Sequence, residues 1–269
     1  MTPGRFRALV LAHYNKHGRT HLPWRKTKDP YKILVSELML QQTQVARVIP
    51  YYNAFLKRFP SVDALAAAPL KEVLALWSGL GYNRRAKYLH EAAKAVMANH
   101  SGVFPQSVDA LTKLPGVGRY TARAVMAFAH NADVYFIETN IRTAVIQSVF
   151  PERTSVTDAQ ILAVLEKAHP KGHAREWYSA LMDYGAHLKQ SGVRSNTKSA
   201  SYTKQAAFKG STREARGAIL RALKEGPKTA TVLLNVLGEV RREQMRDALA
   251  ALTTEGLVSR RGNRYSLPA

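Results

Sequence analysis

The sequence of 269 residues contains no cysteine. It therefore cannot form disulfides, thiolate metal sites or cysteine-ligated iron–sulfur clusters. No apolar run reaches the length needed to cross a membrane, and the start MTPGRFRALVLAHYNKHG lacks the cleavage pattern of a signal peptide. We therefore expect a cytoplasmic protein.

Acidic residues are also scarce. The chain has 40 Lys and Arg against 19 Asp and Glu, a formal net charge of +21. Such an excess favours a polyanionic partner, with nucleic acid ahead of an acidic membrane surface. A surface that only keeps the protein soluble is the alternative. The content of 46% hydrophobic residues predicts a folded globular chain, which we expect to be associated with the nucleoid.

Apolar residues at helical spacing predict an almost entirely helical structure over the first 190 residues. The expected helices include residues 4–18, 31–43, 119–130 and 141–150. Strands are almost absent from this part of the sequence. The expected fold class is therefore all-α.

The segment LPGVGRYTA, residues 114–122, predicts a tight hairpin between two helices. Gly116 and Gly118 allow a sharp turn and a close approach to a partner, because they have no Cβ. A helix that begins at about Arg119 would direct unpaired N–H groups outward, as in many phosphate sites. An ordinary corner between two helices is the other interpretation, since Pro-Gly is a common turn signal.

Glu37 is the one carboxylate in the apolar run ILVSELML. A glutamate on a helix is usually a solvated surface group. These neighbours instead favour a cleft, where burial favours the protonated carboxyl. Gln41 and Gln42 follow at the expected end of the helix, either as amides that act near Glu37 or as simple helix caps.

The bend GLGYNRRAKYLH places Leu80 and Tyr82 beside Arg84 and Arg85. An exposed apolar or aromatic tip flanked by cations suits a wedge between DNA bases. More often such a Leu or Tyr belongs to the core. Both interpretations stay open from the residues alone.

The segment ETNIR, residues 138–142, places Glu138 where a loop meets a helix. The helix dipole favours a carboxylate there. Plain N-capping explains the same position without any catalytic role.

The last third of the chain differs in composition. Residues 191–210 are rich in Lys, Arg and Ser, and suit either a basic strap that contacts phosphates or a solvated linker. Residues 211–269 then predict three helices and a hairpin around Gly262-Asn263, a winged-helix-like arrangement. The arginines of its third helix and wing would face DNA. A protein-interaction module of the same fold is the alternative.

Four segments together resemble the helix–hairpin–helix (HhH-GPD) DNA glycosylases. They are LPWRKTKDPYKILVSELMLQQTQVARVIPYY, LWSGLGYNRRAKYLH, LPGVGRYTARAV and REWYSALMDYGA. The most similar branch is that of the adenine (MutY-type) glycosylases, which remove adenine opposite 8-oxoguanine. The resemblance runs from about residue 6 to residue 190. It implies two helical lobes, one of residues 31–131 with the hairpin and one of residues 1–30 plus 132–190.

The resemblance also implies roles for single residues. Glu37 stands in the place of the acid that protonates the adenine ring. Gln42 resembles the glutamine inserted beside the extruded base, and Tyr82 resembles the intercalating aromatic. Gly116, Val117 and Gly118 match the phosphate-binding hairpin.

Three further positions concern the chemistry at the sugar. Tyr120 stands where lyase-competent relatives carry a Schiff-base lysine, so a monofunctional glycosylase is expected. Asn140 matches an asparagine near the sugar. Glu138 replaces the family aspartate that stabilises the sugar cation, and its extra methylene moves the charge. The family's four cluster cysteines, the first of which would fall near Lys189, are missing, and its C-terminal domain for 8-oxoguanine is not evident.

The residues expected to be catalytic are Glu37, Tyr120, Glu138 and Asn140. Those expected to contact DNA are Gln41, Gln42, Leu80, Tyr82, Arg84, Arg85, Gly116, Val117, Gly118, Arg119, Arg142, Arg241, Arg242 and Arg261.

The resemblance therefore predicts a base-excision-repair glycosylase that flips out a mispaired base and hydrolyses its N-glycosidic bond. Adenine opposite 8-oxoguanine or guanine is the expected substrate. Uracil, thymine, hypoxanthine or another lesion is the alternative, and a catalytically weak DNA-binding or damage-scanning protein is a second one. The expected partner is double-stranded DNA with a lesion or mismatch, bound by a monomer away from membranes. No cofactor, iron–sulfur cluster or side-chain metal site is expected, and a monovalent cation at the hairpin carbonyls is left open.

Overall fold

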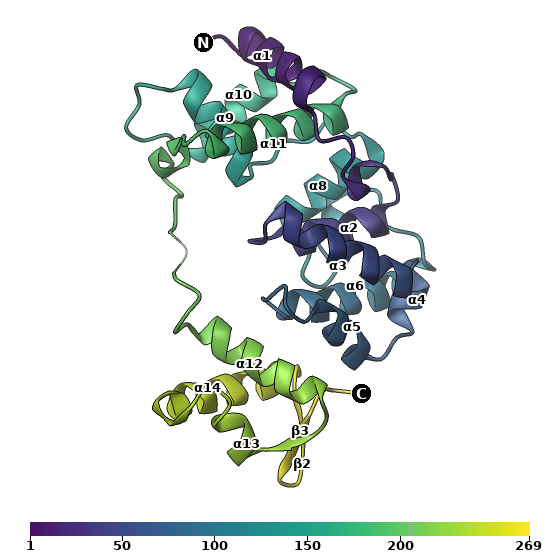
Figure 1. Ribbon diagram of the computed structural model, residues 1–269. Helices are drawn as coiled ribbons and strands as arrows, with labels where there is room; N and C mark the ends of the chain where they lie inside the picture. Colours follow the sequence, from purple (N-terminus) through teal and green to yellow (C-terminus); the bar gives the residue numbers. More distant parts are fainter. Residues whose placement is uncertain (205) are drawn as a thin grey trace. The chain divides into compact units, whose positions relative to one another are not determined.

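The protein, described by a computed structural model over residues 1–204 and 206–269, is mostly helical (Figure 1). This confirms the all-α class expected from the sequence. The chain forms two compact units. The first comprises residues 1–33, 106–112 and 117–204, and the second comprises residues 34–105, 113–116 and the described part of the remainder. None of the described helices is both long and apolar enough to cross a bilayer.

The first unit has a continuous apolar core. Its helices are α1 (Pro3–His17), α7 (Val108–Leu111), α8 (Arg119–His130), α9 (Thr139–Val149), α10 (Asp158–Ala168) and α11 (Ala174–Gln190), with the 3₁₀ turns η1 (Pro23–Arg25) and η2 (Ser195–Lys198). Phe6 of α1 meets Trp177 of α11 edge to face at 6.0 Å, and Phe136 stacks on Tyr178 at 3.9 Å. Such aromatic contacts add specificity to the apolar burial that drives folding. Helix α8, expected in the lobe of residues 31–131, contributes Ala124 and Ala127 to this core.

A buried ion cluster joins the N-terminal segment to α11. Asp183 has a side chain that is 2% exposed, and its two oxygens accept hydrogen bonds from Arg19 and from Arg25 at 2.6–2.7 Å. Burial alone would raise the pKa of Asp183. The hydrogen bonds and positive charges of Arg25 and Arg19 outweigh it and hold that pKa below its ordinary value.

Asp183→Ala is expected to lower the free energy of unfolding by about 3–5 kcal/mol, because it leaves two partly buried guanidinium groups without their carboxylate. Since the folded pKa of Asp183 is lowered, its contribution is present above the ordinary aspartate pKa. It is lost as pH falls through the lowered value. Urea unfolding of both proteins at neutral and acidic pH measures this, with the exposed Asp247→Ala as control. A loss no larger than that of the control would contradict the cluster's stabilising role.

The helical part of the second unit runs to residue 105. Its helices are α2 (Pro30–Leu40, which begins in the first unit), α3 (Val45–Arg58), α4 (Val62–Ala66), α5 (Leu70–Trp77) and α6 (Arg84–His100). Helix α6 packs against α4 and α5, and α3 packs against α5. Helix α2 ends at Leu40, three residues before the end expected at Thr43, and Gln42 lies in a turn with a φ of 55°. The two glutamines Gln41 and Gln42 therefore follow the helix and do not extend it.

The C-terminal residues form three helices and a small sheet. The elements are α12 (Thr212–Lys224), β1 (Lys228–Thr229), α13 (Ala230–Leu234), η3 (Glu239–Arg241), α14 (Arg242–Thr254), β2 (Ser259–Arg261) and β3 (Arg264–Ser266). The hairpin β2–β3 forms as expected, with Arg261 opposite Arg264 and Gly262 in the left-handed region of the turn. Strand β1 pairs antiparallel with β3 and was not expected, because two residues carry no alternating pattern. The arrangement is winged-helix-like, as the sequence predicts.

The segment after α11 is attached to the first unit by backbone and side-chain bonds. Val156 and Ser199 form a parallel bridge, with hydrogen bonds of 2.9 Å from Val156 N to Lys198 O and 3.0 Å from Ala200 N to Val156 O. Arg142 bonds both Ser199 Oγ and the carboxylate of Asp158. Residues 195–200 are therefore held in place here by hydrogen bonds. The rest of the expected strap, which includes position 205 outside the described residues, stays a prediction as a phosphate contact.

Candidate active site and DNA-binding loops

Glu37 lies on α2, in the apolar setting that the sequence predicts. Its neighbours Ile33, Leu34 and Leu38 are all buried, and Glu37 itself is only 6% exposed. A carboxyl group withdrawn from water in this way is favoured in its protonated form unless a cation lies beside it. Its role as an acid stays a prediction.

Arg85 fixes the backbone at the end of α2. Its Nη1 donates to the carbonyl oxygens of Leu38 at 2.5 Å, Met39 at 3.1 Å and Gln41 at 2.6 Å, and its Nη2 donates to Gly81 O at 3.0 Å. These are the carbonyls that a helix end leaves without intrahelical partners. Burial lowers the pKa of Arg85 to about 10, so the guanidinium keeps its charge at neutral pH. The expected DNA contact of Arg85 is therefore incompatible with this structure, in which its donors are used inside the protein.

Arg85→Met is expected to lower the free energy of unfolding by about 2–4 kcal/mol, because it leaves several buried carbonyls without donors. If the base-excision activity that the family resemblance implies is assayed, we also expect slower base release, since the same bonds hold the backbone beyond Glu37. Lys94→Met removes an exposed cation from the same helix and serves as the control. Chemical denaturation and single-turnover kinetics of both variants measure the two effects. Equal stability of the two variants would show that the carbonyl contacts do not matter.

The loops after α2 and before α6 each contain a residue in the left-handed region, Gln42 with a φ of 55° and Tyr82 with a φ of 49°. This conformation is uncommon for residues other than glycine and clusters at functional sites. Two guanidinium groups contact the ring of Tyr82, that of Arg85 at 5.3 Å and that of Arg213 at 5.4 Å from its centroid. The contacts with Arg85 and Arg213 thus hold the ring of Tyr82 in a defined position.

The predicted hairpin adopts the expected turn. Gly116 has a φ of 71°, and a Cβ built on it would lie 2.4 Å from Cβ of Tyr88, so only glycine fits there. Gly118 is the N-cap of α8 and provides no side-chain cap, and Arg119 is exposed. The N-cap position of α8 therefore carries no side chain that would block the approach of a phosphate.

Glu138 is the N-cap of α9. One carboxylate oxygen accepts from the backbone N–H of Asn140 at 2.6 Å and Ile141 at 3.4 Å, and the other accepts from the Asn140 side chain at 2.7 Å. Burial raises the pKa of Glu138, while the backbone N–H groups and the positive charge of Lys189 oppose that rise. The residue therefore serves as the N-cap that the sequence allowed. Capping and a catalytic role are compatible, because both need the carboxylate at this position.

Two residues of α11 contact the start of α9 beside Glu138. The backbone of α11 approaches Asn140 so closely that a Cβ on Gly185 would lie 2.0 Å from Asn140 O. Lys189 donates to Thr139 Oγ1 at 2.8 Å and places its charge beside Glu138. The sequence identified Lys189 as the position of a missing cysteine and as one of the basic residues that begin the expected strap, but not as a neighbour of Glu138. Lys189 and Thr139 are 50 residues apart in the sequence, and no local pattern predicts that they are in contact.

Tyr120 is half-buried on α8, with its ring edge to face against Phe136 at 5.6 Å. Its side chain ends in a phenol and not in an amine. Among residues 1–204 and 206–269, no group of three or more His, Asp or Glu is placed to hold a metal ion.

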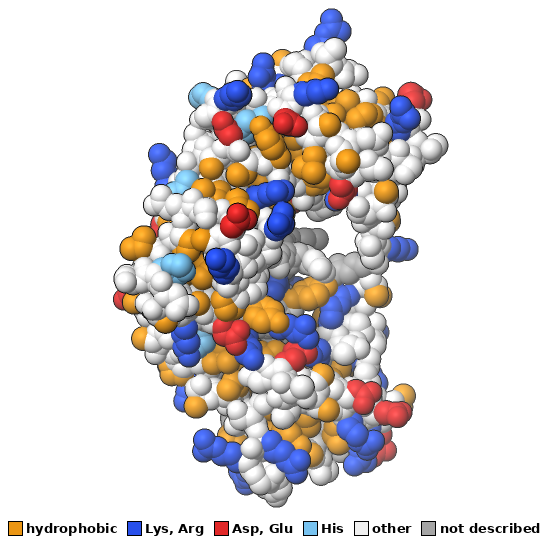
Figure 2. All heavy atoms as spheres, turned by 180° about the vertical axis from the view of Figure 1, so that it is seen from behind, with side chains coloured by type: hydrophobic (Ala, Val, Ile, Leu, Met, Phe, Trp, Pro, Cys, Tyr) orange, Lys and Arg blue, Asp and Glu red, His pale blue; other side chains and the backbone are white. Residues whose placement is uncertain are grey.

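Several residues expected to contact DNA have other surroundings in the structure. Leu80 and Val117 are buried, which removes Leu80 as an exposed tip of the bend. Arg241 pairs with Glu214 at 2.6 Å, and Arg142 pairs with Asp158, because each has a carboxylate within reach. Figure 2 shows Lys and Arg side chains over much of the visible face, with Asp and Glu between them. The net positive charge alone therefore does not identify the surface that contacts DNA.

Six of the expected residues line one cavity of about 530 Å³ in the second unit. They are Gln41, Gln42, Tyr82, Arg84, Arg85 and Gly116. This volume lies within the range of roughly 300–1,000 Å³ for ligand sites. The hairpin turn, the bend and the end of α2 thus come together, although they are far apart in the sequence. The residues expected at the sugar, namely Tyr120, Glu138 and Asn140, belong to the first unit.

Comparison with known proteins gives the same fold and indicates a function. Residues 35–176 match the family model described as HhH-GPD superfamily base excision DNA repair protein. An adenine DNA glycosylase of Buchnera aphidicola subsp. Baizongia pistaciae is 40% identical over 69% of this chain and 53% of its own length. One of Mycolicibacterium smegmatis is 43% identical over 66% of this chain and 61% of its own length. The chain thus spans little more than half the length of these curated relatives.

Solved structures are similar as well. A thermostable thymine-DNA glycosylase aligns with a TM-score of 0.60 and 27% identity, over 68% of this chain and 86% of that one. A non-covalent Endonuclease III–DNA complex aligns with a TM-score of 0.57 and 20% identity, over 70% of this chain and 86% of that one. The second likeness concerns the fold alone.

Proposed function

Since the chain belongs to the HhH-GPD superfamily of base excision DNA repair proteins, we propose that it is a monofunctional DNA glycosylase that removes adenine from mispairs. The observation that carries this proposal is Glu37, a buried carboxyl group on α2, four and five residues before Gln41 and Gln42. Relatives at 40% and 43% identity bear the name adenine DNA glycosylase, which supports adenine as the base.

The first step is extrusion of the base. A base stacked in a duplex cannot reach a protein pocket, and its extrusion costs a few kcal/mol. Tyr82 would enter the stack and Gln42 would fill the space beside the extruded nucleotide. The hairpin at Gly116 and the N-terminus of α8 would hold the phosphates on the same strand.

The second step is cleavage of the N-glycosidic bond. Glu37 in its protonated form would donate its proton to a ring nitrogen of adenine, so that the leaving group departs as the neutral base. The electrons of the glycosidic bond leave with the base, and positive charge develops on the sugar. Glu138 in its ionised form would stabilise that charge before water adds to the sugar. Glycoside cleavage commonly uses two such carboxyl groups with opposite protonation states.

Tyr120 bears on the fate of the strand after the base has left. A glycosylase that also breaks the strand needs an amine that forms a Schiff base with the sugar. The phenol of Tyr120 cannot do so. The product would therefore be an intact strand with an abasic site.

A second candidate is removal of another base. A thymine-DNA glycosylase is among the similar structures at 27% identity, and the chain covers only 53–61% of the adenine-specific relatives. Uracil, thymine and hypoxanthine are thus the alternative substrates.

Single-turnover assays on a panel of labelled duplexes decide between these candidates. Adenine is placed opposite 8-oxoguanine, guanine, cytosine or thymine, and parallel duplexes carry uracil, thymine or hypoxanthine. Release confined to adenine opposite 8-oxoguanine or guanine is the expected result. Release of a different base would move the substrate assignment to the second candidate. If all duplexes bind but none is cleaved, the protein acts as a DNA-binding or scanning protein.

A further inference from the structure

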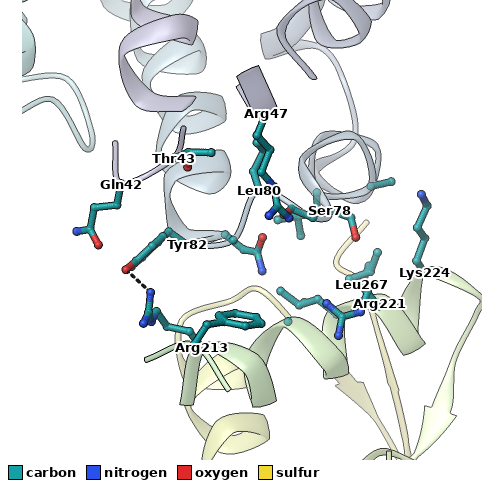
Figure 3. Close-up of a pocket in the computed structure, with 18 of the residues that line it drawn as sticks. Gln42, Thr43, Arg47, Ser78, Leu80, Tyr82, Arg213, Arg221, Lys224 and Leu267 are labelled. Atoms are coloured by element: carbon teal, nitrogen blue, oxygen red, sulfur yellow. Dashed lines mark hydrogen bonds between the residues drawn. The ribbon is translucent and has the colours of Figure 1, made fainter. Parts of the chain in front are cut away.

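The C-terminal domain, taken here as residues 211–269, contacts the loop of Tyr82 through α12. Arg213 Nη1 donates to the Tyr82 hydroxyl at 2.8 Å, and the same guanidinium lies over the Tyr82 ring (Figure 3). A second contact involves Glu255, which binds Arg84 of α6 at 2.6 Å and Arg216 of α12 at 2.5 Å. These hydrogen bonds of the two arginines hold the pKa of Glu255 near 2 although burial would raise it, so this ion pair persists at neutral pH.

A cavity of about 450 Å³ lies beside this contact, between the bend and α12 (Figure 3). Its cationic lining residues are Arg47, Arg213, Arg221 and Lys224. None of the described residues that line it is Asp or Glu. Apolar side chains, including those of Leu220 and Phe208, form part of its wall. Cations around an apolar surface are what a single DNA strand requires, because its phosphates are anionic and its bases have apolar faces.

Within the described residues, the three α12 cations that line the cavity form no ion pair with a carboxylate, whereas Arg216 on the same helix is paired with Glu255. In the part of the chain that the structure describes, neither Arg221 nor Lys224 forms an ion pair, and both are exposed. Arg213 bonds Tyr82 and the carbonyls of Ala206 and Ala207. Its charge is therefore not neutralised either. The α12 face presents net positive charge to the cavity.

The helix that a winged-helix domain ordinarily places in the major groove has a different surface. On α14 the exposed cations Arg242 and Arg246 alternate with the exposed acids Glu243 and Asp247. The charge of this stretch therefore sums to zero. Arg241, which precedes α14, is already paired with Glu214. This helix offers a weaker electrostatic surface for phosphates than α12 does.

We propose that the C-terminal domain binds the DNA through α12, and that the cavity beside Tyr82 takes a segment of one DNA strand. The phosphates contact Arg221 and Lys224, and an unstacked base lies against Leu220 and Phe208. The inference rests on the proposed function in one respect, namely that Tyr82 enters the duplex at the lesion. It replaces the expectation that α14 contacts DNA, and the expected contact of Arg261 in the wing stays a prediction.

Two double variants with the same change of charge compare the two surfaces. Arg221→Gln with Lys224→Gln removes two cations from α12, and Arg242→Gln with Arg246→Gln removes two from α14. Melting temperatures show that both variants fold. Binding to a duplex with an uncleavable adenosine analogue opposite 8-oxoguanine is measured at several salt concentrations. The slope of log affinity against log salt is negative, and each lost phosphate contact lowers its magnitude by about 0.9.

The α12 variant is expected to bind about tenfold more weakly near 0.15 M salt, and the magnitude of its salt slope is expected to fall by about 1.8 for two lost contacts. The α14 variant is expected to stay within twofold of the unaltered protein. An α12 variant that binds like the unaltered protein, or a larger loss in the α14 variant, would overturn the inference.

The same measurements separate failure of this inference from failure of the proposed function. Binding to an undamaged duplex and single-turnover cleavage are measured in parallel. If the unaltered protein cleaves normally and the α12 variant binds DNA as well as it does, only the inference about α12 is contradicted. If the unaltered protein does not cleave but the α12 variant binds DNA more weakly, the proposed function is contradicted and α12 is still the DNA-binding surface.

Discussion

Glu37→Gln is expected to slow single-turnover adenine release by about 10²–10⁴-fold, the range typical of a lost general acid. Glutamine has nearly the same shape and keeps a hydrogen-bond acceptor, but it has no acidic proton to transfer. Glu37 is only 6% exposed on α2, so its carboxyl group is largely withdrawn from bulk water. Binding to the uncleavable duplex should change little, since the substitution preserves volume.

Two controls accompany this variant. Glu166→Gln removes an exposed carboxylate from α10 and should retain the full rate. The binding affinity and melting temperature of Glu37→Gln show whether its fold is intact. A rate within tenfold of the unaltered protein, with intact binding, would mean that another group protonates the leaving base.

Glu138→Gln is expected to reduce the rate by about 10²–10³-fold, because it removes the charge that stabilises the sugar cation. The amide oxygen can still accept hydrogen bonds from the start of α9, so most of the N-cap is retained. The pH dependence adds a second measurement. Burial raises the pKa of Glu138, so its carboxylate takes up a proton at a higher pH than an ordinary glutamate. Activity that needs the ionised form is present above that value and is lost as pH falls through it.

Glu138→Asp tests the geometry separately. It restores the residue type that the family resemblance places there, with the charge one methylene closer to the backbone. We expect a measurable rate with the acidic limb of the pH–rate profile retained, whereas Glu138→Gln should lose that limb. An unchanged rate in Glu138→Gln, measured as single-turnover release over pH 4–8, would exclude the carboxylate from the chemistry.

Local sequence patterns predicted much of the fold. The helix start at Arg119 was predicted from the glycines of the hairpin. Helix α9 begins at Thr139, two residues before the expected start at Ile141, because the side chain of Glu138 caps it. The helix α2 was predicted with its carboxylate in an apolar run, yet its end was misplaced at Thr43. The cause lies in Arg85, 45 residues after Leu40, whose guanidinium binds the carbonyls of the last turn.

Other features of the site depend on tertiary contacts that no local pattern encodes. Lys189 beside Glu138 belongs to a different helix, and Arg142 reaches Ser199 across 57 residues. An arginine that binds DNA and one that ties two loops together look alike in a sequence. The contact between Arg213 and Tyr82, 131 residues apart, is of the same kind.

The absence of cysteine changes how the end of the helical body is held. Residues after α11 are attached through Val156, Ser199 and Arg142, which form hydrogen bonds and one ion pair with their surroundings. Hydrogen bonds of this kind each contribute about 0.5–1.5 kcal/mol. Several of them together can therefore hold a short segment without a metal cluster.

The measurement that tests the central claim most directly is the product analysis of a single turnover. The purified chain is incubated in excess with a duplex that carries adenine opposite 8-oxoguanine, and samples are quenched with or without hot alkali. The account predicts release of free adenine at a rate that does not depend on added metal, with strand breakage only after alkali. Strand breakage without alkali, or a duplex from which no adenine is released, would contradict it.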